Sequence, residues 1–161
     1  MKKPVLDACC GSRMFWFDKQ DARCLYTDIR RETIVTDTRP GRSATVISPD
    51  EIVDVTNMPF DDDSFYHVVF DPPHTVNMSP TTRTVKKYGT LTGDWKDMLR
   101  RGFSECFRVL KPGGTLVFKW SEISVPLKEI LELTPHAPLY GHKSGKQSKT
   151  HWVAFVKEGL C

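Results

Sequence analysis

Short apolar segments that alternate with longer mixed segments constrain the fold of this chain more than any other feature. Each is only a few residues long, and most are bounded by turn-forming residues, which is typical of buried β-strands. The clearest one ends at Pro72-Pro73, where the prolines cannot donate to a strand ladder. The segments expected to form strands are residues 4–9, 24–28, 50–55, 67–71, 115–120, 137–141 and 151–156.

Helices are expected between these strands. Over residues 94–110 the apolar positions recur every three or four residues and give one apolar stripe. Asp94 is a suitable N-cap, and Pro112-Gly113-Gly114 a stop signal. Residues 124–133 are expected to form a shorter helix capped by Ser124, and residues 15–22 a short helix after the first strand.

The order of these elements predicts the fold class. Strands that alternate with helices imply an α/β fold with a parallel sheet covered on both faces. The last two strands are separated by about ten residues, too few for a helical crossover, so they are expected to pair antiparallel. We therefore predict a doubly wound, mostly parallel seven-stranded sheet with a C-terminal antiparallel hairpin. The 161 residues suit one domain, residues 1–161.

The composition argues against several classes of protein. No apolar run approaches the roughly 18–20 residues of a membrane helix. An Asp at position 7, soon after two lysines, is unlike the apolar core of a signal peptide, so a cytoplasmic location is expected. Five cysteines without a C-x-x-C pair argue against both a disulfide framework and a structural zinc site, and no metal is expected.

Four aspartates stand at predicted C-terminal strand ends: Asp7, Asp28, Asp54 and Asp71. In doubly wound sheets the ligand binds outside these ends. Each aspartate alone could be an ordinary cap or turn residue, but all four together are hard to explain in that way. Asp28 follows Asp7 at roughly the 20-residue offset of a carboxylate that binds ribose hydroxyls in dinucleotide sites.

The turn after the first strand, residues 7–13, holds a single glycine, Gly11. A pyrophosphate cradle needs several glycines for close backbone approach. The turn therefore favours a nucleoside ligand over a dinucleotide.

Residues 6–12, Leu-Asp-Ala-Cys-Cys-Gly-Ser, resemble the first motif of class I S-adenosylmethionine-dependent methyltransferases, especially of amino-methyltransferases. Residues 54–65 resemble the segment around the cofactor's adenine, and residues 110–114 the turn before the fifth strand. The resemblance covers nearly the whole chain and implies a Rossmann-like fold that binds S-adenosylmethionine. The cofactor-binding residues that it implies are Asp7, Cys9, Gly11, Asp28, Ile29 and Asp54.

Asp71-Pro72-Pro73-His74 resembles the D-P-P-Y/F/W motif of enzymes that methylate adenine N6 or cytosine N4. An exocyclic amine is a poor nucleophile because its lone pair is delocalised into the ring. Hydrogen bonds from the amine to the Asp71 carboxylate and the Pro72 carbonyl would favour a pyramidal nitrogen, and the prolines hold these acceptors rigidly. His74 departs from the usual Tyr, Phe or Trp; it would stack on a flipped base or contact a base edge. The structural alternative is that Pro-Pro only ends a strand.

Family members with this motif order usually carry a separate target-recognition domain, for which this chain leaves no room. Recognition is then expected from the loop 75–93, the basic loop 142–150, a second subunit as in a homodimer, or a partner. Basic loops can track a phosphate backbone, although ordinary solvated surface is the alternative. Arg13 stands where the first motif has its last glycine. Its side chain is therefore expected either to point away from the cofactor or to reach towards nucleic acid. The basic residues are Arg83, Lys86 and Lys87 in one loop and Lys143, Lys146 and Lys149 in the other.

The leading hypothesis is an enzyme that methylates an exocyclic base amine in DNA or RNA, with adenine N6 favoured over cytosine N4. A small-molecule methyltransferase is the second, because residues 54–65 also resemble quinone-type and metabolite enzymes. A third is a non-catalytic subunit with a degenerate methyltransferase fold. Cofactor binding separates the third from the others, and nucleic-acid methylation separates the first from the second.

Overall fold

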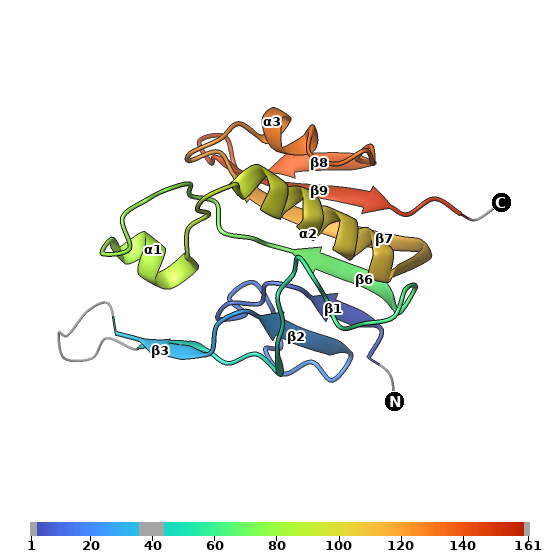
Figure 1. The fold of residues 1–161 in the computed structure, drawn as a ribbon, viewed down its shortest axis with the longest axis horizontal. Helices are drawn as coiled ribbons and strands as arrows, with labels where there is room; N and C mark the ends of the chain where they lie inside the picture. The colour runs from blue at the N-terminus through green and yellow to red at the C-terminus, as the bar shows by residue number, and fades with distance from the viewer. Residues whose placement is uncertain (1–2, 36–43, 160–161) are drawn as a thin grey trace.

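A seven-stranded sheet in the order β5-β2-β1-β6-β7-β9-β8 forms the centre of the computed structural model, which describes residues 3–35 and 44–159 (Figure 1). The first five strands in this order run parallel, and β9 pairs antiparallel with β7 and β8. The predicted α/β class and the terminal antiparallel hairpin are thus confirmed. The strands are β1 (Val5–Asp7), β2 (Cys24–Asp28), β5 (Glu51–Ile52), β6 (Phe65–Phe70), β7 (Leu110–Ser121), β8 (Tyr140–Lys143) and β9 (Thr150–Val156).

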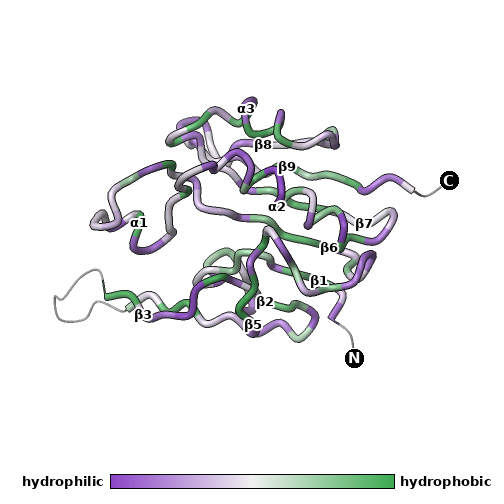
Figure 2. The backbone as a smooth tube through the Cα atoms, viewed as in Figure 1, coloured by the Kyte–Doolittle hydropathy of each residue, from purple (hydrophilic) through white to green (hydrophobic). Residues whose placement is uncertain are grey.

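Helix α2 (Trp95–Val109) lies across one face of the sheet and covers the main core (Figure 1). Its apolar side packs through Leu99 and Phe103 on alternate strand residues such as Phe70 and Phe118, all nearly without solvent exposure. The hydrophobic stretches along β6, β7 and β9 in Figure 2 are this core seen along the backbone. Alternation along each strand puts every second residue here and the others on the opposite face.

The opposite face carries a smaller apolar cluster over β1 and β2. Cys10, Cys24 and Tyr26 are buried there beneath Trp16. Trp16 comes from residues 15–22, which form turns and bends, so the helix predicted over this segment is wrong.

Local hydrogen bonds explain why residues 15–22 do not form a helix. The carboxylates of Asp18 and Asp21 accept hydrogen bonds from the backbone N–H groups of Gln20 and Arg23, at 2.8 and 2.9 Å. Such bonds give the backbone an alternative to helix.

Several predicted boundaries differ from the structure. The helix expected over 124–133 is the short α3 (Leu127–Leu131), which follows Pro126, and the strand expected over 50–55 is reduced to β5. The strand expected over 115–120 begins earlier because Leu110 already has an extended backbone, with φ −78° and ψ 134°. The strand expected over 137–141 lies a few residues later, as β8.

Two elements have no counterpart in the sequence-based prediction. The hairpin of β3 (Glu32–Ile34) and β4 (Thr45–Ile47) is inserted after β2, and α1 (Arg83–Tyr88) forms within the expected loop 75–93. Both lie beyond the C-terminal ends of the parallel strands, on the left of Figure 1. Arg30 joins the two regions, because its guanidinium donates to the carbonyls of Lys86 and Lys87 at 3.4 and 3.5 Å. No helix within the described ranges is long and apolar enough to span a membrane.

Candidate active site

A cavity of about 610 Å³ opens at the C-terminal ends of β1, β2, β5 and β6. From β1 the chain continues to β2 on one side, and β6 lies on the other, so the cavity lies at the switch point of the sheet. Its volume is within the range of small-molecule sites. The predicted site residues that line it are Cys9, Gly11, Asp28, Ile29, Asp54, Asp71, Pro72, Pro73 and His74.

Asp28 is buried and holds two loops at the cavity wall. One oxygen accepts a hydrogen bond from the Gly11 N–H at 2.9 Å, and the other accepts one from the Arg30 N–H at 2.9 Å. Gly11 has φ +50°, a left-handed conformation that glycine adopts without a steric cost. Next to Asp28, the Ile29 side chain lines the cavity while remaining largely exposed.

Asp54 and Cys9 line other parts of the wall. Asp54 is exposed, and one of its oxygens accepts hydrogen bonds from the Thr56 N–H and hydroxyl, both at 2.8 Å. It is therefore a turn residue as well as a lining residue. Burial raises the pKa of the Cys9 thiol well above its ordinary value, so Cys9 is an unreactive thiol.

Asp7, expected among the cofactor-binding residues, does not line the cavity. Its side chain is fully buried, where one oxygen accepts a hydrogen bond from Trp16 Nε1 at 2.7 Å and the other contacts the Cys9 N–H at 3.4 Å. Burial raises its pKa to about 7. Asp7 lies two residues from Val5 and so faces the cluster over β1 and β2, where Trp16 reaches it.

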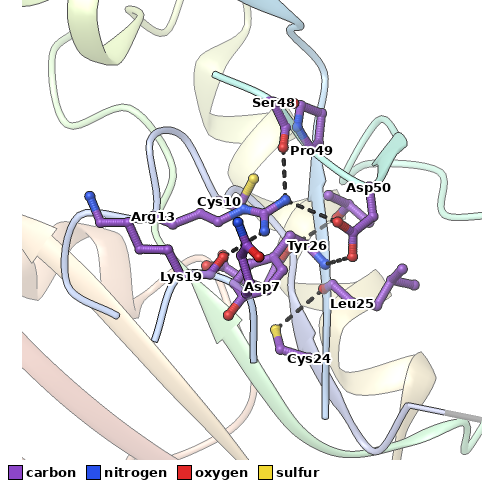
Figure 3. Close-up of polar contacts among 12 residues, drawn as sticks. Asp7, Cys10, Arg13, Lys19, Cys24, Leu25, Tyr26, Ser48, Pro49 and Asp50 are labelled. Carbon is purple, nitrogen blue, oxygen red and sulfur yellow. Dashed lines mark hydrogen bonds and ion pairs between the residues drawn. The ribbon is translucent and has the colours of Figure 1, made fainter. Parts of the chain in front are cut away.

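Arg13 does not line the cavity, and its side chain extends instead towards Ser48 and Asp50 (Figure 3), so of the two alternatives it points away from the cofactor site. Its guanidinium donates to the carbonyls of Lys19 and Ser48, both at 2.7 Å, and to the Asp50 carboxylate at 3.0 Å. It also stacks over the Tyr26 ring at 3.8 Å. Its φ of +54° is the conformation that a glycine favours, and these contacts offset the cost for a residue with a side chain.

The Asp71 carboxylate has a partner on each oxygen. His74 Nε2 lies 2.9 Å from Oδ1, and the ammonium of Lys119 lies 2.8 Å from Oδ2. All three side chains are largely buried and line the cavity. Pro72 also lines the cavity, and no hydrogen bond from another described residue reaches its carbonyl oxygen.

Pro73 fixes this segment against the end of α1. A Cβ added to Gly89 would lie 3.1 Å from Pro73 Cγ, and the φ of Gly89 is +81°. Only glycine meets both constraints easily, so the contact between the Asp-Pro-Pro-His segment and α1 is a close one.

Lys119 is the main site residue that the sequence reasoning missed. It lies in β7 between Phe118 and Trp120, which point into the main core, so Lys119 faces the other side of the sheet. There its ammonium lies 5.5 and 5.7 Å from the ring centres of Phe15 and Trp152. A lysine inside an otherwise apolar strand is the signal that could have identified it.

The basic segments lie at the cavity to different extents. Thr84, Lys87 and Tyr88 of α1 line it, while Arg83 and Lys86 are exposed beside them. Of the loop 142–150, only Thr150 lines the cavity.

Comparison with solved structures places this architecture among known folds. The PH0226 protein from Pyrococcus horikoshii is 16% identical with a TM-score of 0.57, over 96% of this chain and 81% of that one. A Haloferax volcanii protein solved in complex with the Trm112 methyltransferase activator is 14% identical with a TM-score of 0.54, over 99% and 84% of the two chains. An S-adenosylmethionine-dependent methyltransferase from Methanosarcina mazei is 14% identical with a TM-score of 0.53, over 96% and 92%.

The chain has the fold of S-adenosylmethionine-dependent methyltransferases. No protein-family model and no curated protein matches the sequence. At these identities the likeness establishes the methyltransferase fold, and the activity has to be argued from the residues of the site.

Proposed function

We propose that this chain is an S-adenosylmethionine-dependent methyltransferase that modifies an exocyclic amine of a nucleic-acid base. Adenine N6 in DNA or RNA is our first choice of target, and cytosine N4 the second. The observation that carries the proposal is the position of Asp71-Pro72-Pro73-His74 at the end of β6, in the same cavity as Asp28.

The residues of the cavity fit the cofactor. A carboxylate has about four lone-pair sites, and Asp28 uses two of them for Gly11 and Arg30, which leaves acceptors for ribose hydroxyls. The apolar side chains of Ile29, Val53 and Val55 line the cavity beside it and would suit the adenine ring. Asp54 has an oxygen to spare for the adenine amine. When bound, the cofactor supplies an electrophilic methyl group.

The far side of the cavity suits an aromatic amine. Asp71 keeps lone pairs beyond those used by His74 and Lys119, and the Pro72 carbonyl is an available acceptor. Two hydrogen bonds from the amine to these acceptors would disfavour its planar, delocalised form and leave the nitrogen lone pair available for attack. These bonds strengthen as the nitrogen becomes positive in the transition state, and contacts that are stronger in the transition state than in the ground state raise the rate.

A nucleic-acid substrate is favoured by the surroundings of the cavity. The half-buried Lys87 lines it, and the exposed Arg83 and Lys86 extend a cationic surface along α1. Cations placed in this way neutralise phosphates. We propose that α1 and the loop 142–150 contribute to target recognition within this chain. A second copy or a partner protein could add to it, as the Trm112 complex of the Haloferax volcanii protein illustrates.

The test is radiolabelled methyl transfer from S-adenosylmethionine to pooled DNA and RNA, followed by mass spectrometry of the nucleosides. We expect an N6-methylated adenosine, or an N4-methylated cytidine, in the ribose or deoxyribose form. Label on a ring carbon or a ribose oxygen would refute the amine mechanism. Cofactor binding without any label on DNA or RNA would favour the small-molecule alternative, and absence of cofactor binding would favour the non-catalytic one.

The proposed role of the Asp71 carboxylate is tested with the variant Asp71→Ala. Losing a preorganised electrostatic contact of this kind typically lowers turnover about 100- to 1000-fold. Cofactor affinity, measured by calorimetry, should change little, because the proposed partner of Asp71 is the substrate amine. Near-normal turnover in this variant would contradict the assignment.

A further inference from the structure

We propose that the substrate presents its target base on a single strand, and that bases next to the target stack on the loop 14–17. This inference rests on the proposed function and names the form of nucleic acid that the site takes. It is carried by the sequence Met-Phe-Trp-Phe of this loop, which displays apolar side chains to solvent beside the cavity.

The loop exposes more apolar surface than its surroundings require. Met14 lines the cavity and is 55% exposed. Phe17, two residues after the cavity-lining Phe15, has a fully exposed side chain. A phenyl ring left in water contributes no burial to folding, and apolar side chains gathered on a surface mark binding sites. The loop is therefore a candidate contact surface.

The loop is held in place by its own contacts. Trp16 Nε1 donates to the Asp7 carboxylate at 2.7 Å, and the Trp16 ring packs edge-on against Tyr26 with ring centres 5.1 Å apart. The Arg13 guanidinium donates to the Lys19 carbonyl at 2.7 Å and so connects the two sides of the loop (Figure 3). A surface held in this way loses little conformational entropy when a ligand binds.

Phe15 connects the loop to the reacting end of the cavity. The Lys119 ammonium lies 5.5 Å from the centre of the Phe15 ring and 2.8 Å from Asp71 Oδ2. One lysine thus bridges the loop and the carboxylate that we propose binds the target amine. The groups that reach the loop when the target base is bound are the neighbouring bases of the same strand.

Exposed cations lie next to this aromatic surface. Phe15 meets Trp152 at 89° with ring centres 5.3 Å apart, and Trp152 Nε1 donates to the Ser144 hydroxyl oxygen at 3.1 Å. Ser144 belongs to the basic loop 142–150. Proteins bind single strands by combining rings that stack on bases with cations that follow the backbone. The exposed cations of the basic loop are Lys143, Lys146 and Lys149.

A single strand fits the loop 14–17 better than a duplex does. In a duplex the faces of each base are covered by the neighbouring base pairs, so a protein surface meets phosphates, sugars and base edges. The side chains of Met14 and Phe17 have no donor for a phosphate. The exposed Asp18 carboxylate, next to Phe17, would repel one. Unpaired bases offer uncharged faces to these side chains.

Three substitutions at Phe17 separate base stacking from other roles. Phe17→Ala removes the ring, and the core should be unaffected because the ring is fully exposed. Phe17→Leu keeps an apolar side chain without a ring, and Phe17→Trp keeps an aromatic face. Tyr66→Ala is the matched control, because Tyr66 is a 61% exposed aromatic residue near the N-terminal end of β6 and does not line the cavity. Thermal unfolding should be the same for all of these proteins.

Binding is measured by fluorescence anisotropy at one salt concentration, with S-adenosylhomocysteine present so that no methyl transfer occurs. The probes are a fluorescein-labelled DNA strand of mixed sequence, the same strand annealed to its complement, and the RNA strand of that sequence. We expect one of the single strands to bind about tenfold or more tightly than the duplex. Phe17→Ala should weaken binding of that strand about 5- to 150-fold, the range for one base stacked on an aromatic ring. Phe17→Leu should resemble Phe17→Ala, while Phe17→Trp and Tyr66→Ala should bind like the parent.

Several outcomes would overturn the inference. One is binding of the duplex as tightly as of the single strands, and another is unchanged single-strand affinity in Phe17→Ala. Analytical ultracentrifugation tests the alternative that the loop joins two copies of the chain, since Phe17→Ala would then dissociate a dimer. If the parent methylates no base in any nucleic acid, the proposed function fails. If it methylates bases in duplexes as readily as in single strands, only the present inference fails.

Discussion

Asp28 joins the loop after β1 to the turn after β2, because its two oxygens accept hydrogen bonds from the N–H groups of Gly11 and Arg30. Asp7, 21 residues earlier, holds the indole of Trp16 and is sealed from the cavity. The two carboxylates look equivalent in the sequence, yet Asp28 lines the cavity and Asp7 does not. Their substitutions should therefore have different effects.

Replacing Asp28 should weaken cofactor binding. Asp28→Ala removes a charged acceptor from the proposed ribose contact, which should cost roughly 1.5–3 kcal/mol, or about 10- to 150-fold in affinity. Calorimetry with S-adenosylmethionine, well below the unfolding temperature of the variant, measures this. Asp28→Asn keeps one acceptor and should bind with intermediate affinity. Unchanged affinity in Asp28→Ala would remove the ribose assignment.

Replacing Asp7 should change how stability depends on pH. The unfolded chain releases the Asp7 proton near its ordinary pKa of 3.8, while the folded protein keeps it up to about 7. Between these values the folded state binds more protons, so the free energy of unfolding falls as pH rises, by up to about 1.4 kcal/mol per pH unit.

Asp7→Asn lacks this proton and can still accept from Trp16. Urea denaturation between pH 4 and 7 should show a smaller decline, or a steeper rise, in stability with pH for the variant than for the parent. Other carboxyls such as Asp50 and Glu105, whose pKa values are lowered, act equally in both proteins and cancel in the comparison. Parallel pH profiles would show that Asp7 ionises normally.

At the scale of single elements, α2 depends on local signals that the sequence displays. Asp94 caps it by accepting a hydrogen bond from the Asp97 N–H at 3.1 Å, and an apolar stripe faces the sheet. α1 has a capping residue but no apolar stripe: it has six residues and buries only Val85. It forms where Thr82 caps it and Arg30, distant in sequence, holds its last carbonyls.

Removing the cap of α2 should destabilise the protein by about 1 kcal/mol, the usual cost of losing an N-cap side chain. The change is Asp94→Ala, and chemical denaturation measures it. Asp94→Ser provides another capping oxygen and should restore most of the loss. Equal stability of parent and Asp94→Ala would mean that packing on the sheet alone fixes the start of α2.

For the whole molecule, the sequence predicts the sheet and nine of the residues that line the cavity, because both follow from local patterns. Alternating apolar segments give strands, and residues at their C-terminal ends converge wherever the strands are parallel. It does not predict contacts between distant segments. The indole of Trp16 on Asp7 and the pairing of Lys119 with Asp71 arise only when separate strands are placed side by side. For the same reason the sequence alone does not predict the direction of the Arg13 side chain, which contacts the distant Ser48 and Asp50.

Charge acts at the scale of the whole molecule as well. If α1 helps to hold a phosphate backbone, nucleic-acid binding should weaken with salt, with a log–log slope of roughly −0.7 to −0.9 per phosphate neutralised. A combined change of Arg83, Lys86 and Lys87 to Ala should lower both affinity and slope in fluorescence titrations. Lys96, Arg100 and Lys128, exposed on α2 and α3 and not lining the cavity, form the matched control triple. If both triple variants change nucleic-acid affinity and salt slope equally, α1 has no specific role in holding the phosphate backbone.

The contact of Phe15 with Trp152, whose ring centres lie 5.3 Å apart near Lys119, has a consequence for synthesis of the chain. A ribosome produces Phe15 early and Trp152 near the end of this sequence, and β9 then inserts between β7 and β8. Contacts between such distant residues form late and slowly. A nascent chain that stops before β9 lacks Trp152, so the Lys119–Asp71 pair is open to water on the side where Trp152 would lie, even if the earlier helices and strands have formed. Translation has to pass residue 152 before Trp152 can cover that side of the Lys119–Asp71 pair.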